Sequence, residues 1–149
     1  MNTDILNKAY HYLSIRDHSI KEISDKLRKK FETREEIEEV ITYLKEHSYL
    51  NDVEFAQKYL SYKLANRSCG QLKIKYDLMK KGVSKDIIAS VLADQVLAAN
   101  ELETAQELIA KKARVLENLD PLKRKNKAFS YLKNRGFTPD TIYKVLERC

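Results

Sequence analysis

The residues of this sequence best suited to chemistry are lysines and arginines, which gather in two segments. From Gln57 to Gly82 the chain carries seven bases and one acid, and from Lys111 to Arg135 it carries nine bases and two acids. Such segments can neutralise the phosphates of a nucleic acid or pair with an acidic protein surface. The candidate binding residues are Lys58, Lys63, Arg67, Lys73, Lys75, Lys80 and Lys81 in the first segment, and Lys111, Lys112, Arg114, Lys123, Arg124, Lys125 and Lys127 in the second.

Acidic residues dominate two other parts of the chain. Glu32 to Glu54 holds two bases and eight acids, and Asp86 to Ala110 holds five acids and no base, while the whole chain carries a net charge of +6. Lysine-rich helix faces are often only solvated surface. Charge that is separated along the chain in this way nevertheless exceeds what solubility requires. The pattern therefore favours an acidic partner, with nucleic acid as the first candidate.

Three tyrosines accompany the bases, at Tyr62, Tyr76 and Tyr131. A tyrosine ring beside lysines can stack on the bases of a single-stranded nucleic acid. These tyrosines also stand at the spacing of a helix face that packs in a core, where large side chains tend to be buried. We therefore predict that the three are core residues before they are binding residues.

The sequence contains no pattern typical of catalysis or metal binding. His11, His18 and His47 have no Cys or acid at a metal-ligand spacing, and we interpret them as surface residues. Cys69 has no neighbouring base to activate its thiol, and Cys149 lies too far along the chain to suggest a disulfide framework. There is no Gly-rich phosphate loop and no nucleophile motif. The sequence predicts a binding protein with no enzymatic activity, metal or cofactor.

The elements that must position the bases are short α-helices. With 3 Gly and 2 Pro in 149 residues there is little material for the turns of a sheet, and apolar residues recur at helical spacing. We predict nine helices, several of which begin at capping residues such as Ser19, Thr33, Asn51 and Asp120. The seventh is expected to begin near Asn100 or Glu101 and to include Leu116.

The helices group in threes. Leu78 to Ser84 (LMKKGVS) matches Leu132 to Thr138 (LKNRGFT), and in both a Gly ends one helix while a Ser or Thr caps the next. Gly82 is predicted to be a left-handed C-cap. We therefore predict an all-α fold of three tandem, helix-turn-helix-like domains, at 1–48, 49–98 and 99–149. Each is too small to be very stable alone, so we expect shared contacts and an elongated row of domains.

Three pieces of the chain follow one another in a distinctive order. The first is SYLNDVEFA at Ser48–Ala56, the second is Gly70, and the third is LMKKGV at Leu78–Val83. This order resembles the RecX family of bacterial recombination regulators, whose pattern is GY(L/I)-D-(D/N)-x-x-(F/Y)-A, then Gly, then L-x-x-K-G-(I/V). Asn51 stands where the family usually has Asp, which keeps the N-cap chemistry. Ser48 stands where the family usually has Gly.

The resemblance implies a regulator of the RecA recombinase that has no enzymatic activity. It implies binding in the groove of the RecA–DNA filament, with inhibition of the ATPase, co-protease and strand-exchange activities of RecA in recombination and DNA repair. The basic segments would face single- or double-stranded DNA or acidic RecA surface. Whether the protein caps filament ends or lies along the groove stays open.

Two other functions fit a chain of three-helix domains. One is a helix-turn-helix transcription regulator that binds duplex DNA, although four glutamates crowd the third helix, where a recognition helix would stand: Glu35, Glu36, Glu38 and Glu39. The other is a scaffold that binds only proteins. No window approaches a run of roughly 18 apolar residues, and there is no signal-peptide pattern. We expect a cytoplasmic monomer that does not contact membranes.

Overall fold

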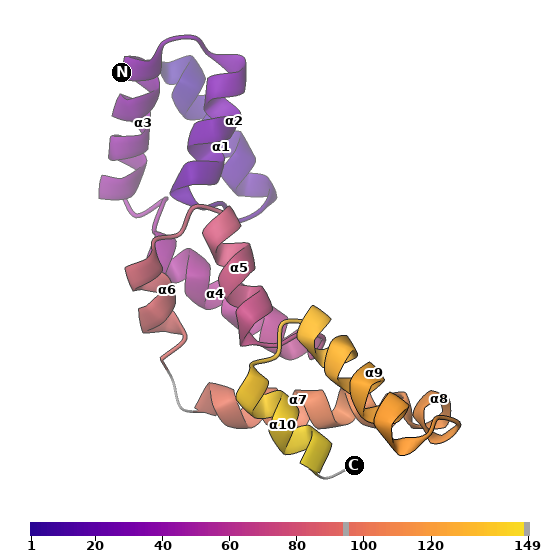
Figure 1. Ribbon diagram of the computed structural model, residues 1–149. Helices are drawn as coiled ribbons and strands as arrows, with labels where there is room; N and C mark the ends of the chain where they lie inside the picture. Colours follow the sequence, from indigo (N-terminus) through magenta and orange to yellow (C-terminus); the bar gives the residue numbers. More distant parts are fainter. Residues whose placement is uncertain (94–95, 148–149) are drawn as a thin grey trace. The chain divides into compact units, whose positions relative to one another are not determined.

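The computed structural model describes residues 1–93 and 96–147. Within these residues the chain forms ten α-helices and no strand (Figure 1), which confirms the all-α fold class. The helices are α1 (Thr3–Ile15), α2 (Ile20–Lys30), α3 (Arg34–Glu46), α4 (Asp52–Asn66), α5 (Gln71–Lys80), α6 (Lys85–Val91), α7 (Val96–Lys111), α8 (Ala113–Glu117), α9 (Pro121–Asn134) and α10 (Pro139–Glu147). They belong to two compact units, unit 1 (residues 1–58 and 78–88) and unit 2 (residues 59–77 and 89–149).

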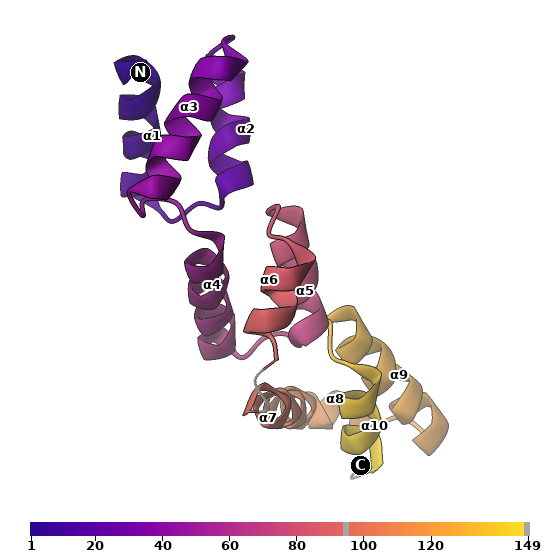
Figure 2. The same ribbon diagram turned by 90° about the vertical axis from the view of Figure 1, so that its left-hand side faces the viewer.

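Unit 1 is built on α1, α2 and α3, each of which packs against the other two (Figure 2). The three helices have apolar stripes at helical spacing, for example Ile37, Val40 and Leu44 on α3. The stripes meet in one core, whose buried members are Ile5, Ala9, Ile23, Leu27, Ile37, Val40, Leu44 and Leu50. Burial of these aliphatic side chains is the main force that holds the three helices together.

The helix starts of unit 1 follow local capping chemistry. Ser19 and Glu22 form the predicted capping box, because the Glu22 amide donates to Ser19 Oγ and the Ser19 amide donates to Glu22 Oε1, both at 3.1 Å. Asn51 Oδ1 accepts from the amides of Val53 and Glu54, as predicted. Thr33 stands at the predicted N-cap position, but its hydroxyl donates to a Glu36 carboxylate oxygen at 2.8 Å and accepts no backbone amide.

The end of α5 confirms the predicted glycine cap. Gly82 has a φ of 85°, and the Val83 amide donates to the Leu78 carbonyl at 3.1 Å, which closes the helix end. A Cβ at Gly82 would also lie 2.4 Å from the Cβ of Lys21. Both the positive φ and this close approach require glycine.

Replacing Gly82 with Val is therefore expected to lower the free energy of unfolding by about 2 kcal/mol, because a β-branched residue resists positive φ. Urea unfolding of the variant and the wild type measures the difference. Gly82→Ala is the graded control and should lose less, about 1 kcal/mol. A Val variant as stable as the wild type would contradict the left-handed cap.

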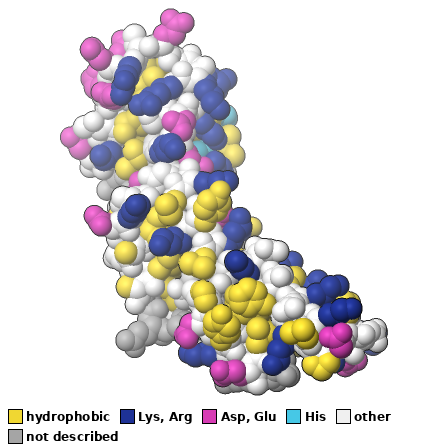
Figure 3. Space-filling view, viewed as in Figure 1, with side chains coloured by type: hydrophobic (Ala, Val, Ile, Leu, Met, Phe, Trp, Pro, Cys, Tyr) yellow, Lys and Arg dark blue, Asp and Glu magenta, His cyan; other side chains and the backbone are white. Residues whose placement is uncertain are grey.

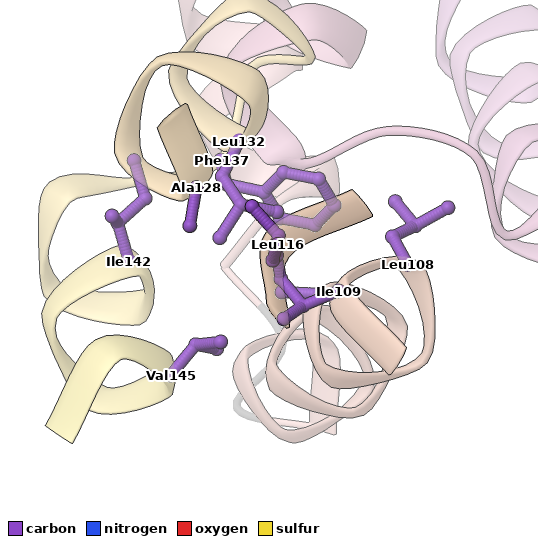
Figure 4. Close-up of a cluster of buried hydrophobic side chains, with 9 residues drawn as sticks. Leu108, Ile109, Leu116, Ala128, Leu132, Phe137, Ile142 and Val145 are labelled. Carbon is purple, nitrogen blue, oxygen red and sulfur yellow. The ribbon is translucent and has the colours of Figure 1, made fainter. Parts of the chain in front are cut away.

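Unit 2 has its own core, shown in Figure 4. Aliphatic side chains of α7 and α8 meet those of α9 and α10 around the ring of Phe137, which lies between α9 and α10. The buried members are Ala105, Leu108, Ile109, Leu116, Ala128, Leu132, Phe137, Ile142 and Val145. The start of α10 is capped as predicted from its sequence, because Thr138 Oγ1 accepts the Thr141 amide at 3.4 Å.

The predicted seventh helix is wrong in two respects. It begins earlier, at Val96, and it breaks at Lys112 into α7 and the short α8, so the described residues hold ten helices where nine were predicted. The break lets Leu116 enter the core of unit 2. The guanidinium of Arg124 then donates to the carbonyls of Leu116 and Leu119 at 3.1 and 3.2 Å, which satisfies acceptors at the end of α8.

Two segments of unit 2 meet backbone to backbone in what we call the glycine joint, formed by residues 70–72 and 135–136. The Gly70 amide donates to the Arg135 carbonyl at 3.0 Å, and the Leu72 amide donates to the Gly136 carbonyl at 2.9 Å. A Cβ on Gly70 would lie 2.5 Å from the Cα of Phe137. Gly70 therefore permits a close approach of two backbones, and it does not end α4 with a left-handed turn; Arg67, with a φ of 47°, takes that conformation.

A buried carboxylate lies beside the glycine joint. Glu101 of α7 is 5% exposed, and its Oε1 accepts the Thr138 amide at 2.9 Å and the Gln71 amide at 3.4 Å. These amides lie at the N-termini of α10 and α5, where the helix dipole favours a negative charge. One side chain therefore caps two helices of unit 2.

The three histidines were predicted to be surface residues, and for His18 this is wrong. His18 is buried in unit 1, with Nδ1 2.9 Å from the Arg16 carbonyl oxygen and Nε2 2.7 Å from Lys26 Nζ. Burial lowers its pKa below the ordinary value. A neutral ring that donates from Nδ1 and accepts the lysine ammonium at Nε2 fits both hydrogen bonds. His11 and His47 are exposed, as predicted.

Candidate binding interface

The structure divides the first basic segment between the two units. Lys58, Lys80 and Lys81 belong to unit 1, whereas the other four bases of that segment belong to unit 2. All seven candidate bases of the second segment also belong to unit 2, which therefore holds eleven of the fourteen candidates. The main basic surface is thus built on unit 2, from α4, α5 and the region between α7 and α9.

Two candidate bases of unit 1 form ion pairs. Lys58 Nζ lies 3.1 Å from Glu54 and 3.6 Å from Asp17, and the hydrogen bond with Glu54 and the charge of Asp17 raise the pKa of Lys58. Lys81 Nζ lies 3.7 Å from Glu22. Their charges are partly compensated by neighbouring carboxylates, so they attract an external anion less strongly than an uncompensated lysine would.

Two of the candidate bases on α4 and α5 in unit 2 also form ion pairs. Arg67 lies 2.6 Å from Glu107, and Lys73 lies 3.1 Å from Asp77. The Tyr59 hydroxyl also donates to Asp77 at 2.7 Å. Burial alone would raise the pKa of Asp77, but the hydrogen bonds from Tyr59 and Lys73 outweigh it and lower that pKa. Lys75 is exposed on the solvent side of α5.

The prediction that the three tyrosines are core residues is wrong for two of them. Tyr62 is 62% exposed and Tyr76 is 52% exposed. The buried face of α5 is formed by Ile74 and Leu78, and Tyr76, two residues from each, lies on the opposite side of the helix. Only Tyr131 is partly buried, packed against the core of unit 2. Two aromatic rings are therefore exposed on the surface beside lysines.

The second basic segment surrounds Tyr131. The Lys112 ammonium lies 4.4 Å from the centre of the Tyr131 ring, and the Arg135 guanidinium carbon lies 4.9 Å from it, both within cation–π range. Arg135 also donates to the Ser68 carbonyl at 3.2 Å. Figure 3 shows Lys and Arg side chains gathered over α9, at the lower right of the view. Candidate bases of this segment that are exposed are Lys111, Lys112, Arg114, Lys123, Lys125 and Lys127.

Arg135 was not among the candidates predicted from the sequence. Its position carries a signal, because it precedes Gly136 in the LKNRGFT match and so corresponds to Lys81 before Gly82. Arg124 was a candidate, but it is half-buried and its guanidinium bonds to carbonyls of its own unit. Of the seven candidates in the second segment, the other six are exposed.

No group of three His, Cys, Asp or Glu side chains within 1–93 and 96–147 is placed to hold a metal ion. Burial raises the pKa of the Cys69 thiol, which disfavours the reactive thiolate. Cys149 lies outside the described residues. Across the same residues, no helix combines the length and the apolar character that crossing a membrane requires.

These features define an all-α protein with exposed bases and tyrosines on its surface. The models of the first, second and third three-helix domains of RecX match residues 6–44, 51–92 and 99–146. The chain therefore belongs to the RecX family of regulatory proteins.

Individual relatives agree with this assignment. Regulatory protein RecX of Prosthecochloris aestuarii is 35% identical over 142 residues, which cover 95% of this chain and 91% of the relative. The same-named protein of Clostridium perfringens strain 13 is 36% identical over 130 residues, 86% of this chain, but the match spans only 60% of that relative. The crystal structure of RecX from Lactobacillus salivarius has a TM-score of 0.90 at 27% identity, with 98% and 94% of the two chains covered.

Proposed function

We propose that this protein is a regulator of RecA that binds the RecA–DNA filament and inhibits its ATPase, co-protease and strand-exchange activities. The observation that carries the proposal is membership of the RecX family over all three domains. We further propose that the protein acts as a cytoplasmic monomer and that its domains divide at 1–48, 49–98 and 99–149. The relatives are named as regulatory proteins, which agrees with a role without catalysis.

In this proposal the exposed bases of unit 2 supply the attraction to the filament. Lys75 on α5 and the lysines of α9 can neutralise DNA phosphates or pair with carboxylates on RecA. Tyr62 and Tyr76 are exposed near lysines, where they can stack on bases of single-stranded DNA. Binding in the filament groove would place such a protein where ATP hydrolysis and strand exchange can both be hindered.

The helix-turn-helix alternative has weaker support from the charges. A recognition helix must approach phosphates in the major groove, but the third helix of the first domain, α3, presents exposed Glu35, Glu38 and Glu39. Glu36 on the same helix has a lowered pKa because Asn2 and Thr33 hydrogen-bond to it, so it too is ionised at neutral pH. Four carboxylates on one short helix repel DNA.

The direct test follows ATP hydrolysis by RecA on single-stranded DNA while this protein is added. Hydrolysis is expected to fall at substoichiometric to equimolar protein. Unchanged hydrolysis over that range would sink the proposal. Sequence-specific binding to duplex DNA at physiological salt, with RecA unaffected, would support the transcription-regulator alternative.

Charge reversal of exposed bases in unit 2 tests the surface itself. The triple variant Lys75→Glu, Lys123→Glu and Lys125→Glu leaves the ion-paired Lys73 and Lys81 intact. This variant is expected to weaken filament binding at least about tenfold. The slope of log affinity against log salt concentration should also become shallower, by about 0.7 for each single-strand phosphate that the variant no longer neutralises. Fluorescence anisotropy on labelled filaments at several salt concentrations measures both quantities.

The matched control reverses three exposed lysines of unit 1, Lys29, Lys30 and Lys45, and so changes the net charge equally. Its binding should stay within about threefold of the wild type, because only a long-range charge effect, which salt screens, would remain. Equal effects of the two triple variants would mean that net charge matters and the surface around α5 and α9 does not.

A further inference from the structure

Unit 2 contains an apolar groove between α7–α8 and α9, which we call the α9 groove. It has a volume of about 340 Å³ and is lined by Ile109, Lys112, Val115, Leu116, Asn126, Lys127, Ala128, Ser130 and Tyr131. Its deepest side chains, Ile109, Leu116 and Ala128, are buried members of the core. Val115 forms part of its wall and is 59% exposed.

The edge of the α9 groove is positively charged. Lys112 and Lys127 line it, and none of its nine lining residues is an acid. Lys123 stands four residues before Lys127 and therefore lies one helical turn away on the same side of α9. The groove thus pairs an aliphatic interior with cations at its edge.

This combination fits a protein segment better than a nucleic acid. Four of the nine lining residues are aliphatic, Ile109, Val115, Leu116 and Ala128, and their side chains offer no flat platform on which a base could stack. The single ring, Tyr131, already has the Lys112 ammonium 4.4 Å and the Arg135 guanidinium 4.9 Å from its centre. A phosphate backbone could pair with the lysines, but it has no apolar group to place in the interior of the groove. Its binding would therefore gain no free energy from the burial of apolar surface.

We propose that the α9 groove binds an acidic segment of the protein partner, with a large aliphatic or aromatic side chain in the groove and flanking carboxylates paired with Lys112 and Lys127. Its volume lies within the range of sites that enclose a small ligand. Short-range pairing with the lysines orients the segment, and burial of the apolar side chain supplies the affinity. The identity of that partner as RecA rests on the proposed function, whereas the chemistry of the groove does not.

Fluorescence anisotropy with synthetic peptides tests the groove without any RecA. The probe is a labelled eleven-residue peptide of Asp and Glu with two central leucines, and its counterpart has asparagines in place of the leucines. The leucine peptide is expected to bind at least about fivefold tighter, because only it buries apolar area in the groove. Equal affinity for the two peptides would overturn the proposal, since it would show charge attraction alone. Competition by oligo-dT at the same site, with no preference for leucine, would assign the groove to nucleic acid instead.

Two matched pairs of variants place the peptide in the groove. Lys127→Glu should weaken binding of the leucine peptide about tenfold, whereas Lys133→Glu, an equal charge change on the same helix at an exposed residue that does not line the groove, should weaken it less than about threefold. Val115→Asp should weaken it at least about fivefold and Val115→Ala about twofold, because aspartate adds repulsion in the wall. Equal effects within either pair would overturn the assignment.

A photo-crosslinking residue at Val115 identifies the partner segment in the filament. With RecA on single-stranded DNA, the proposal expects a crosslink to a RecA peptide rich in Asp and Glu. A crosslink to DNA, to a basic peptide or to a second copy of this chain would overturn it. If RecA is neither bound nor inhibited, the proposed function fails, and the peptide measurements still decide whether the groove takes acidic segments.

Discussion

Replacing Gly70 with Ala is expected to lower the free energy of unfolding of this protein by about 3 kcal/mol. The added Cβ would lie 2.5 Å from the Cα of Phe137 and 2.6 Å from the carbonyl oxygen of Gly136, and backbone atoms cannot move aside as a flexible side chain can. Such overpacking costs roughly 1–3 kcal/mol. Separating the two segments would also weaken the joint's two backbone hydrogen bonds, each with a net value of about 1 kcal/mol.

Urea unfolding of Gly70→Ala beside Gly136→Ala and Gly82→Ala gives a graded comparison. Gly136→Ala should be destabilised as much as Gly70→Ala or more, because Gly136 has a φ of 83° and its Cβ would lie 2.4 Å from the Lys73 amide nitrogen. Gly82→Ala should be destabilised least, since its Cβ would meet side-chain atoms of Lys21. A surface control, Ser61→Ala on α4, should stay within about 0.5 kcal/mol of the wild type. Equal stabilities of the first three variants would contradict the close approach of the two backbones.

Replacing Glu101 with Ala is expected to lower the free energy of unfolding by about 3 kcal/mol. The substitution leaves the amides of Thr138 and Gln71 without their acceptor in a part of unit 2 where Glu101 itself is 5% exposed. Each buried donor without a partner costs roughly 1–3 kcal/mol. The favourable interaction of the carboxylate with the N-termini of α5 and α10 is removed as well.

Two further variants separate these contributions. Glu101→Gln keeps an oxygen that can accept a hydrogen bond but removes the charge, so its destabilisation should be about half that of Glu101→Ala. Glu103→Ala removes a carboxylate two residues away and should change stability by less than about 0.5 kcal/mol. Thermal unfolding followed by circular dichroism measures all three. A Glu101→Ala variant that melts with the wild type would show that water replaces the carboxylate at both helix starts.

Features of the fold that depend on neighbouring residues in the chain were predictable from the sequence. The capping box of Ser19 and Glu22, the Asn51 cap and the left-handed Gly82 each use partners within a few positions. The periodic apolar stripes, such as that of α3, predicted the cores because a helix brings those positions to one face. Local chemistry therefore determines where most of the helices begin and end.

Features that depend on distant partners were not predictable in the same way. The residues around Gly70 did not reveal its role, which is set by Phe137 and Gly136, far away in the sequence. Glu101 was predicted only as a possible helix start, and only the folded chain brings Thr138 and Gln71 to it. The sequence around His18 likewise did not reveal that its ring nitrogens would find partners in a buried position.

Predictions about the binding residues also failed where they depended on contacts in the folded chain. Composition located the two basic segments, but it could not separate Lys73, paired with Asp77, from the exposed Lys75 two positions later. The apolar spacing also placed Tyr76 in the core, although the buried face of α5 lies on the other side of that helix. The groove between α8 and α9 is lined by Lys112, at the helix break that the sequence did not predict.

The glycine joint also bears on the order in which the protein can be made. The amides of Gly70 and Leu72 find their carbonyl acceptors only at Arg135 and Gly136, which follow much later in the chain. A nascent chain that has left the ribosome as far as α6 can complete the three-helix core of unit 1. The start of α5 cannot form its final hydrogen bonds until α9 and α10 have also emerged. Until they emerge, its amide hydrogens exchange with water and its backbone is open to proteases and to chaperones. Translation as far as Gly136 therefore sets the moment at which the start of α5 becomes protected.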